Sequence, residues 1–125
     1  MKKIFSLLIL SLFFACSENK NEKQNVDQTM KEETFTISKK TSENLKHRYL
    51  LTESIPTEGG PKITADAQHA AFSKIEYQQD GIFYVYQPEE GFTGTDEVEI
   101  THYISPGGPE MTATGVTKLQ IVVSE

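Results

Sequence analysis

Residues 74–88 read KIEYQQDGIFYVYQP, and this stretch decides the fold class. Asp80 and Gly81 can fill the two central positions of a type I′ turn, where both residues need a positive φ. The turn then pairs Tyr77 with Tyr84 across a hairpin, and directly opposed residues share a face of the sheet. The core face is predicted to carry Ile75, Tyr77, Tyr84 and Tyr86, and the outer face Glu76, Gln78, Phe83 and Val85.

Alternation of apolar and polar residues predicts further half-buried strands on both sides of this hairpin. They cover residues 35–37, 45–51, 97–104 and 112–123. Their apolar sides carry Leu45, His47, Tyr49 and Leu51; Val98, Ile100, His102 and Ile104; and Leu119, Ile121 and Val123. Residues 55–61 are expected to break the chain, residues 65–71 to form a loop or single turn, and Gly115 to mark a bulge. Six or seven short strands with regular turn signals predict an all-β fold, an antiparallel sandwich.

Residues 1–15 carry the pattern of an export signal. Lys2 and Lys3 give a basic start, and an apolar run of roughly a dozen residues follows up to Ala15. That run is too short to cross a hydrocarbon core of about 30 Å as a helix, which needs about 20 residues. The segment is therefore predicted to be a removable signal peptide. No other stretch of the sequence is apolar enough to span a membrane.

Cys16 is the one cysteine of the chain, so no internal disulfide can form. The stretch LFFAC that ends at Cys16 resembles a bacterial lipobox. The resemblance implies a lipoprotein whose Cys16 is acylated, with palmitate or a similar chain, and becomes the new N-terminus in the cell envelope. The residue after the cysteine is Ser17. Because it is not an aspartate, the same resemblance makes it compatible with sorting to the outer membrane rather than the inner one. The alternatives are a plain secretory cut after Ser17, with Ala15 and Ser17 as the small pair, and a structural core cysteine.

The segment after the cysteine is strongly polar. Between residues 17 and 33 only Val26 and Met30 are apolar, so residues 16–33 are predicted to be a lipidated, disordered tether and residues 34–125 the domain. A short helix over residues 27–33 is the alternative. Removal of the signal peptide leaves 10 basic and 18 acidic residues, a net charge of −8. This charge argues against nucleic acid as a partner and against adhesion to anionic lipid, so attachment to the membrane is expected to come from acyl chains.

The stretch YVYQPEEGFTGTD, residues 84–96, resembles a bacterial immunoglobulin-like, cadherin-like repeat. Those modules carry Tyr-x-Pro, a two-residue spacer and Gly-Phe-x-Gly-x-Asp. The matching residues here are Tyr86, Pro88, Gly91, Phe92, Gly94 and Asp96. The resemblance implies an immunoglobulin-like β-sandwich of about seven strands and leaves the function open. Phe92 is expected to plug one end of the sandwich, and Asp96 to accept backbone N–H groups of its own loop.

Related modules bind calcium through acidic loop residues, and calcium needs six to eight oxygen ligands. The nearest supply is Glu89, Glu90, Asp96 and Glu97. The acidic Asp-Gly turn that commonly follows in the family is replaced by SPGG at residues 105–108. No cofactor or metal is therefore assigned, and calcium at residues 91–96 stays an open alternative.

Candidate catalytic and metal-binding residues form no recognisable set. His102 and His47 alternate with apolar residues, as packed histidines do. His69 follows Asp66 by three residues, but zinc usually takes three or four protein ligands. Glu97 and Glu99 share one strand face without an identifiable cleft. The chain is thus predicted not to be an enzyme, and a small hydrolase is the remote alternative.

The preferred interpretation is a non-catalytic module that binds an envelope protein or a glycan. Two surfaces are candidates. One is a sheet face with Phe83, Val85 and Tyr103, which Tyr49 could join. The other is the loop after residue 104, with Pro106, Gly107 and Gly108. A structural spacer or subunit of an envelope complex is the alternative.

Overall fold

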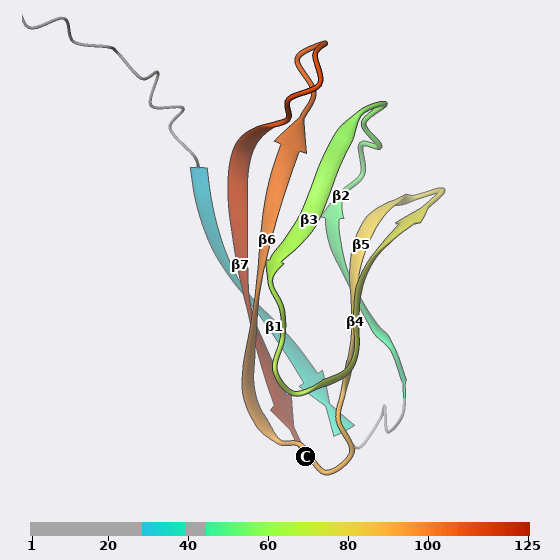
Figure 1. Cartoon of the computed structure of the whole chain (residues 1–125). Coiled ribbons are helices and arrows are strands. Elements are labelled where there is room, and N and C mark those ends of the chain that lie inside the picture. The colour runs from blue at the N-terminus through green and yellow to red at the C-terminus, as the bar shows by residue number, and fades with distance from the viewer. Residues whose placement is uncertain (1–28, 40–44) are drawn as a thin grey trace, which may run out of the picture.

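The computed structural model describes residues 29–39 and 45–125. In this part of the chain seven strands form two sheets packed face to face (Figure 1). The strands are β1 Thr29–Ser38, β2 His47–Thr52, β3 Gly59–Ala65, β4 Ala70–Gln78, β5 Gly81–Pro88, β6 Gly94–Ile104 and β7 Thr112–Ser124. The predicted all-β sandwich of about seven strands is confirmed.

The strand order is β1-β7-β6-β3 in one sheet and β2-β5-β4 in the other. The third, sixth and seventh strands thus share one sheet and the second, fourth and fifth the other, which is the immunoglobulin-like arrangement. All pairs are antiparallel except β1 with β7, which run parallel from Thr29 opposite Gly115 to Ser38 opposite Ser124. The sheets are therefore antiparallel with one parallel edge strand.

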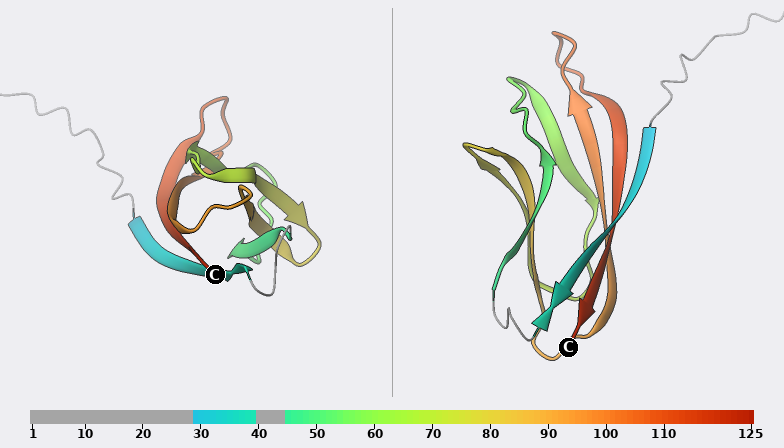
Figure 2. Two further views of the ribbon diagram at one scale, coloured as in Figure 1. Left: turned by 90° about the horizontal axis from the view of Figure 1, so that it is seen from below. Right: turned by 180° about the vertical axis from the view of Figure 1, so that it is seen from behind.

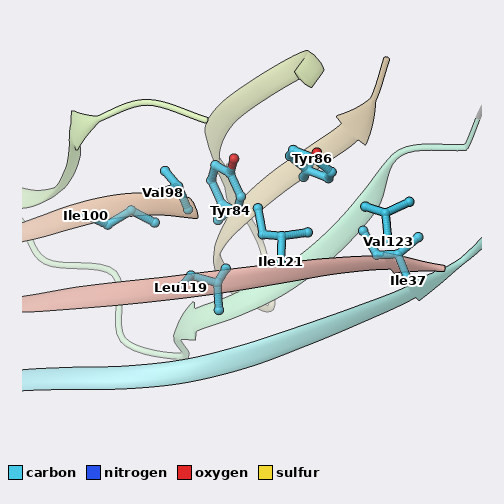
Figure 3. Packing of buried hydrophobic residues seen from close by; sticks show 8 residues of the cluster. All are labelled: Ile37, Tyr84, Tyr86, Val98, Ile100, Leu119, Ile121 and Val123. Atoms are coloured by element: carbon cyan, nitrogen blue, oxygen red, sulfur yellow. The ribbon is translucent and has the colours of Figure 1, made fainter. Parts of the chain in front are cut away.

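The core lies between the sheets and draws on four strands. Tyr84 and Tyr86 project from β5 toward the aliphatic residues of the facing sheet (Figure 3). The buried cluster is Ile37, Tyr84, Tyr86, Val98, Ile100, Leu119, Ile121 and Val123. The inward sides predicted for β6 and β7 are confirmed at the centre of the sandwich. Both tyrosine hydroxyls have partners, as buried phenols require.

The β4–β5 hairpin forms with a register two residues away from the predicted one. Gln79 and Asp80 make the turn, and Gln78 lies opposite Gly81. Gly81 opens β5 with φ +143°, and a Cβ there would lie 2.6 Å from the carbonyl oxygen of Thr52. The glycine is therefore needed for close approach to β2 rather than for the turn. Because the shift is even, the predicted face sets stay intact. Tyr77, which was predicted to lie in the core, is nevertheless 53% exposed, because it lies near the end of β4.

β1 begins at Thr29, whereas the domain was predicted to start at Thr34. Residues 29–33 pair with β7 from Gly115 to Leu119, so this part of the predicted tether is neither disordered nor the alternative helix. Most of their side chains are exposed, and backbone pairing with β7 rather than burial holds the strand. The predicted signal peptide, Cys16 and the rest of the tether, residues 1–28, lie outside the described residues.

The predicted chain break at residues 55–61 extends too far, because β3 already starts at Gly59 and contains Pro61. Proline is tolerated there since β3 is an edge strand and need not donate on both sides. Residues 66–69 form the predicted connection. The predicted bulge is confirmed beside Gly115, where the β6–β7 register skips Thr114.

Three connections gather at one end of the sandwich, hereafter the loop end (Figure 2). They are residues 53–58 between β2 and β3, 79–80 between β4 and β5, and 105–111 between β6 and β7. β1 also begins at this end, while the C-terminus and the β3–β4 and β5–β6 connections lie at the opposite end (Figure 1). Within the described ranges there is no helix long and apolar enough to cross a bilayer.

Candidate functional site

An open cleft of about 270 Å³ lies at the loop end, between the two sheets. The β2–β3 loop forms one wall, and the last residues of β6 with Thr114 of β7 form the other. Its lining is Leu51, Thr52, Ser54, Ile55, Pro56, Gly60, Pro61, His102, Tyr103, Ile104 and Thr114. The cleft is thus an apolar opening at the exposed end of the core.

Large apolar side chains stand half-exposed around this cleft. Ile55 is 50% exposed and Ile104 is 49% exposed, and both line it. Met111 of the neighbouring loop is also exposed. Single exposed apolar residues are ordinary, but several around one concave site mark a binding surface. We take this loop-end cleft as the candidate functional site.

Tyr77 closes the side of the sandwich next to the cleft. Its hydroxyl lies so close to Gly60 that a Cβ there would approach it to 2.5 Å. Gly60 also has φ +110°, a region that side chains disfavour. The contact ties the end of β4 to the start of β3, two edge strands of different sheets.

His102 lies at the inner part of the cleft, and its Nε2 is 2.9 Å from the Thr117 hydroxyl. The prediction that His102 is packed rather than a metal ligand agrees with this position, and its ring is also hydrogen-bonded. Burial, and secondarily the charge of Lys31, lower the pKa of His102. Burial also lowers the pKa of His47, whose Nε2 is buried without a hydrogen-bond partner among the residues described here.

Stability is expected to fall as the pH drops below about 6.5, the ordinary histidine pKa. With lowered pKa values in the fold, His47 and His102 stay neutral there while the unfolded chain takes up protons. Thermal melting at pH 7.5 and 5.5 measures the effect, and the double variant His47→Gln/His102→Gln should show a shallower dependence. His69→Gln, which leaves both buried rings in place, serves as the control. An unchanged slope in the double variant contradicts the assignment.

The predicted sheet-face patch is not formed. Phe83 and Val85 lie on the outer face of the β2-β5-β4 sheet but are only 7% and 2% exposed. The Arg48 guanidinium stands 4.4 Å from the Phe83 ring centroid, and Arg48 and Lys74 flank Val85 on the two neighbouring strands. Long charged side chains thus cover these apolar residues with their stems. The expectation that they offer an exposed apolar surface is wrong.

The remaining residues of that patch lie elsewhere. Tyr103 belongs to the other sheet, where the Lys62 ammonium is 5.5 Å from its ring centroid. Tyr49 packs against the core, with its ring centroid 5.6 Å from that of Phe35. The structure therefore does not bring Tyr103 or Tyr49 together with Phe83 and Val85.

The predicted recognition loop lies at the same end of the sandwich as the candidate site but does not line the cleft. Pro106, Gly107 and Gly108 are exposed in the β6–β7 connection, which belongs to the loop end. The cleft residues Ile55 and Ile104 were not predicted as site residues. Alternation placed Ile104 with the inward-facing side chains of β6. Its position as the last residue of the strand could have indicated that it lies at the loop end, where the core is open to solvent.

Asp96 is a buried carboxylate that ties loops together at the opposite end. Its oxygens accept hydrogen bonds from the N–H groups of Gln68 (3.0 Å), His69 (2.9 Å) and Glu97 (3.0 Å) and from the Tyr86 hydroxyl (3.0 Å). The prediction that Asp96 accepts backbone N–H groups is confirmed, but two of its three backbone donors come from the β3–β4 connection rather than from its own loop. Burial opposes ionisation, but these hydrogen bonds outweigh it and lower the Asp96 pKa.

The other motif residues support the same corner. Pro88 is the last residue of β5, and Gly91 and Gly94 have φ values of +80° and +131°. The Phe92 ring packs against the core and stacks on His69, with centroids 4.4 Å apart. This agrees with the predicted plug at the end of the sandwich.

Within the described ranges, no group of three or more His, Cys, Asp and Glu residues could hold a metal ion. Asp66 of the possible Asp66–His69 pair accepts hydrogen bonds from Ala67 N–H (2.8 Å) and the Ser73 hydroxyl (2.5 Å). Glu97 pairs with Lys118 at 3.5 Å. Asp66 and Glu97 thus each have structural partners close to their own positions.

The serine nearest to an acidic group is also engaged structurally. The Ser73 hydroxyl contacts Asp66 and lies 2.8 Å from the Tyr84 hydroxyl, while His69 stacks on Phe92. These contacts join β4 to β5 and to the β3–β4 connection.

Comparisons with protein-family models, curated proteins and solved structures find no match to this chain.

Proposed function

We propose that this chain is a bacterial lipoprotein, anchored through acylated Cys16, whose immunoglobulin-like domain is a non-catalytic interaction module. The loop-end cleft is the observation that carries the proposal, because it combines an apolar hollow with half-exposed Ile55 and Ile104. Residues 84–96 support kinship with the cadherin-like repeats, and the signal-like residues 1–15 support an envelope location. The outer membrane is the proposed site of the anchor.

The place where β1 begins determines the end by which the module would be tethered. Thr29, the first residue of β1, lies at the loop end, and twelve residues separate it from Cys16 (Figure 1). A chain of that length spans at most about 45 Å. An anchor at Cys16 would therefore tether the domain by its loop end and keep that end within about this distance of the membrane, which favours a protein or glycan partner close to the membrane surface.

The structural-spacer alternative has its own support. The outer face of the β1-β7-β6-β3 sheet is polar, with Glu32, Lys118 and Glu99 side by side along one row of paired residues. A spacer needs no more than such a surface. The half-exposed aliphatic cleft distinguishes the two functions, because a spacer gains nothing from it.

The anchor is tested by palmitate labelling in cells. Cys16→Ser is expected to abolish the label and release the protein from membranes, because each acyl chain contributes about 0.8 kcal/mol per buried CH₂. Retention of the label would disprove acylation at this residue. A Ser17→Ala variant, which keeps the thiol, is the control.

The docking surface is tested with photo-crosslinking residues introduced at positions 55 and 107, and at position 89 as a control at the opposite end. We expect one envelope component to crosslink from the loop end in intact cells and not from position 89. Absence of any product from both loop-end positions would refute the interaction module and favour the spacer.

A further inference from the structure

We propose that the loop-end cleft binds a basic protein segment that inserts one large apolar side chain. This inference rests on the proposed function and names the chemistry of its partner. It is carried by two independent features of the same end, the shape of the cleft and the charge of the three connections.

The charge of the loop end has one sign. The three connections carry Glu53, Glu58, Asp80 and Glu110, and they contain no lysine or arginine. All four acids are exposed. The three connections at this end of the sandwich are therefore acidic, although Lys62 stands over the cleft residue Tyr103, and their charge favours a partner of opposite sign.

Most of this charge is not neutralised within the domain. Of the four acids, only Asp80 has a cationic partner, since its carboxylate lies 3.9 Å from the Arg48 guanidinium. Glu53, Glu58 and Glu110 form no ion pair with any residue that the structure describes. On the sheet surface, by contrast, Lys118 pairs with Glu97 at 3.5 Å. The loop end thus carries uncompensated negative charge at the same end of the sandwich as the cleft.

The cleft has the size for one anchor residue. A cavity of about 150 Å³ can hold a benzene molecule, so about 270 Å³ admits one aromatic or branched aliphatic side chain with room to spare. Ile55 and Ile104 would lose their remaining exposure to such an anchor. An apolar anchor inside a charged rim is the usual anatomy of a protein-binding site.

The same charge argues against lipid as the occupant. Acidic loops repel an anionic bilayer surface. A membrane-proximal protein segment rich in lysine or arginine satisfies both the charge and the position.

Fluorescence anisotropy with a labelled hexapeptide tests the inference, using the full chain with Cys16→Ser so that no acyl group interferes. The probe has a central Leu-Phe flanked by two lysines on each side. Matched peptides carry glutamates at the flanks or serines at the centre. Binding is expected only for the lysine-flanked Leu-Phe peptide, and it should weaken as salt is raised.

Two sets of variants separate charge from shape. E53Q/E58Q/E110Q should weaken binding about tenfold at low salt, whereas E89Q/E90Q/E125Q, which removes the same charge at the opposite end, should change it less than about twofold. I55S/I104S should weaken binding about tenfold at any salt concentration, with L45S, an exposed leucine away from the cleft, as the control.

Equal binding of the acidic peptide, or equal effects of the two charge triplets, would overturn the inference. So would binding to phosphatidylcholine vesicles that I55S/I104S abolishes, since it would assign the cleft to lipid. Crosslinking from position 55 in cells together with no preference for the basic peptide would leave the interaction module standing and refute only the basic partner.

Discussion

Asp96→Ala is expected to lower the free energy of unfolding by about 3–5 kcal/mol, the cost of breaking a buried charged hydrogen-bond network. Asp96 is 5% exposed, and its removal leaves the N–H groups of Gln68 and His69 without their acceptor. The Tyr86 hydroxyl, whose pKa is raised by burial and by the charge of Asp96, loses its carboxylate partner as well. Denaturant unfolding followed by tyrosine fluorescence measures the loss.

Glu97→Gln is the matched control, because it changes the next carboxylate, which is exposed and pairs with Lys118 at the surface. Its cost should stay below about 1 kcal/mol. Asp96→Asn should fall between the two variants, since an amide keeps one acceptor oxygen. A loss of less than 1 kcal/mol for Asp96→Ala would show that the buried brace does not stabilise the corner.

Ile121→Ala is expected to cost about 2–5 kcal/mol, the range for truncating a fully buried aliphatic side chain. Ile121 is 0% exposed and lies in the core cluster between the sheets (Figure 3). Its neighbours in the register are Phe35 on β1 and Asp96 on β6, so a cavity there would loosen the contact of three strands. Thermal and urea unfolding give the value.

Gln120→Thr provides the contrast, because Gln120 is the preceding residue and points to the exposed face. Threonine keeps the strand preference, so the change should stay within about 0.5 kcal/mol. Similar losses for Gln120→Thr and Ile121→Ala would contradict the alternation of buried and exposed residues along β7.

The faces of the strands were predictable, and the registers were not. Burial on one side of a strand leaves a period of two in the sequence, which is why Tyr84 and Tyr86 or Leu119 and Ile121 were assigned correctly. A register shift by two residues preserves this period, so alternation alone cannot distinguish the two hairpin registers. The predicted register assumed that Gly81 lies in the turn. The close approach of Gly81 to Thr52 involves another strand, which no local pattern reveals.

Long-range contacts explain the other differences. Residues 29–33 lack an apolar pattern because β1 is held there by backbone pairing with β7. Asp96 was recognised as a brace, but its partners at Gln68 and His69 are brought to it by the fold. The cleft likewise depends on loops that the fold brings together at one end. Of these loops, only residues 105–108 were named from the sequence as a candidate recognition site.

The parallel pairing of β1 with β7 has a mechanical consequence. A pull transmitted from the proposed anchor reaches the domain at Thr29 and acts along the strand, so the ten residue pairs from Thr29–Gly115 to Ser38–Ser124 share the load in shear. A strand attached by its other end would instead peel away one pair at a time. This arrangement would help the domain to stay folded under force applied through the proposed anchor.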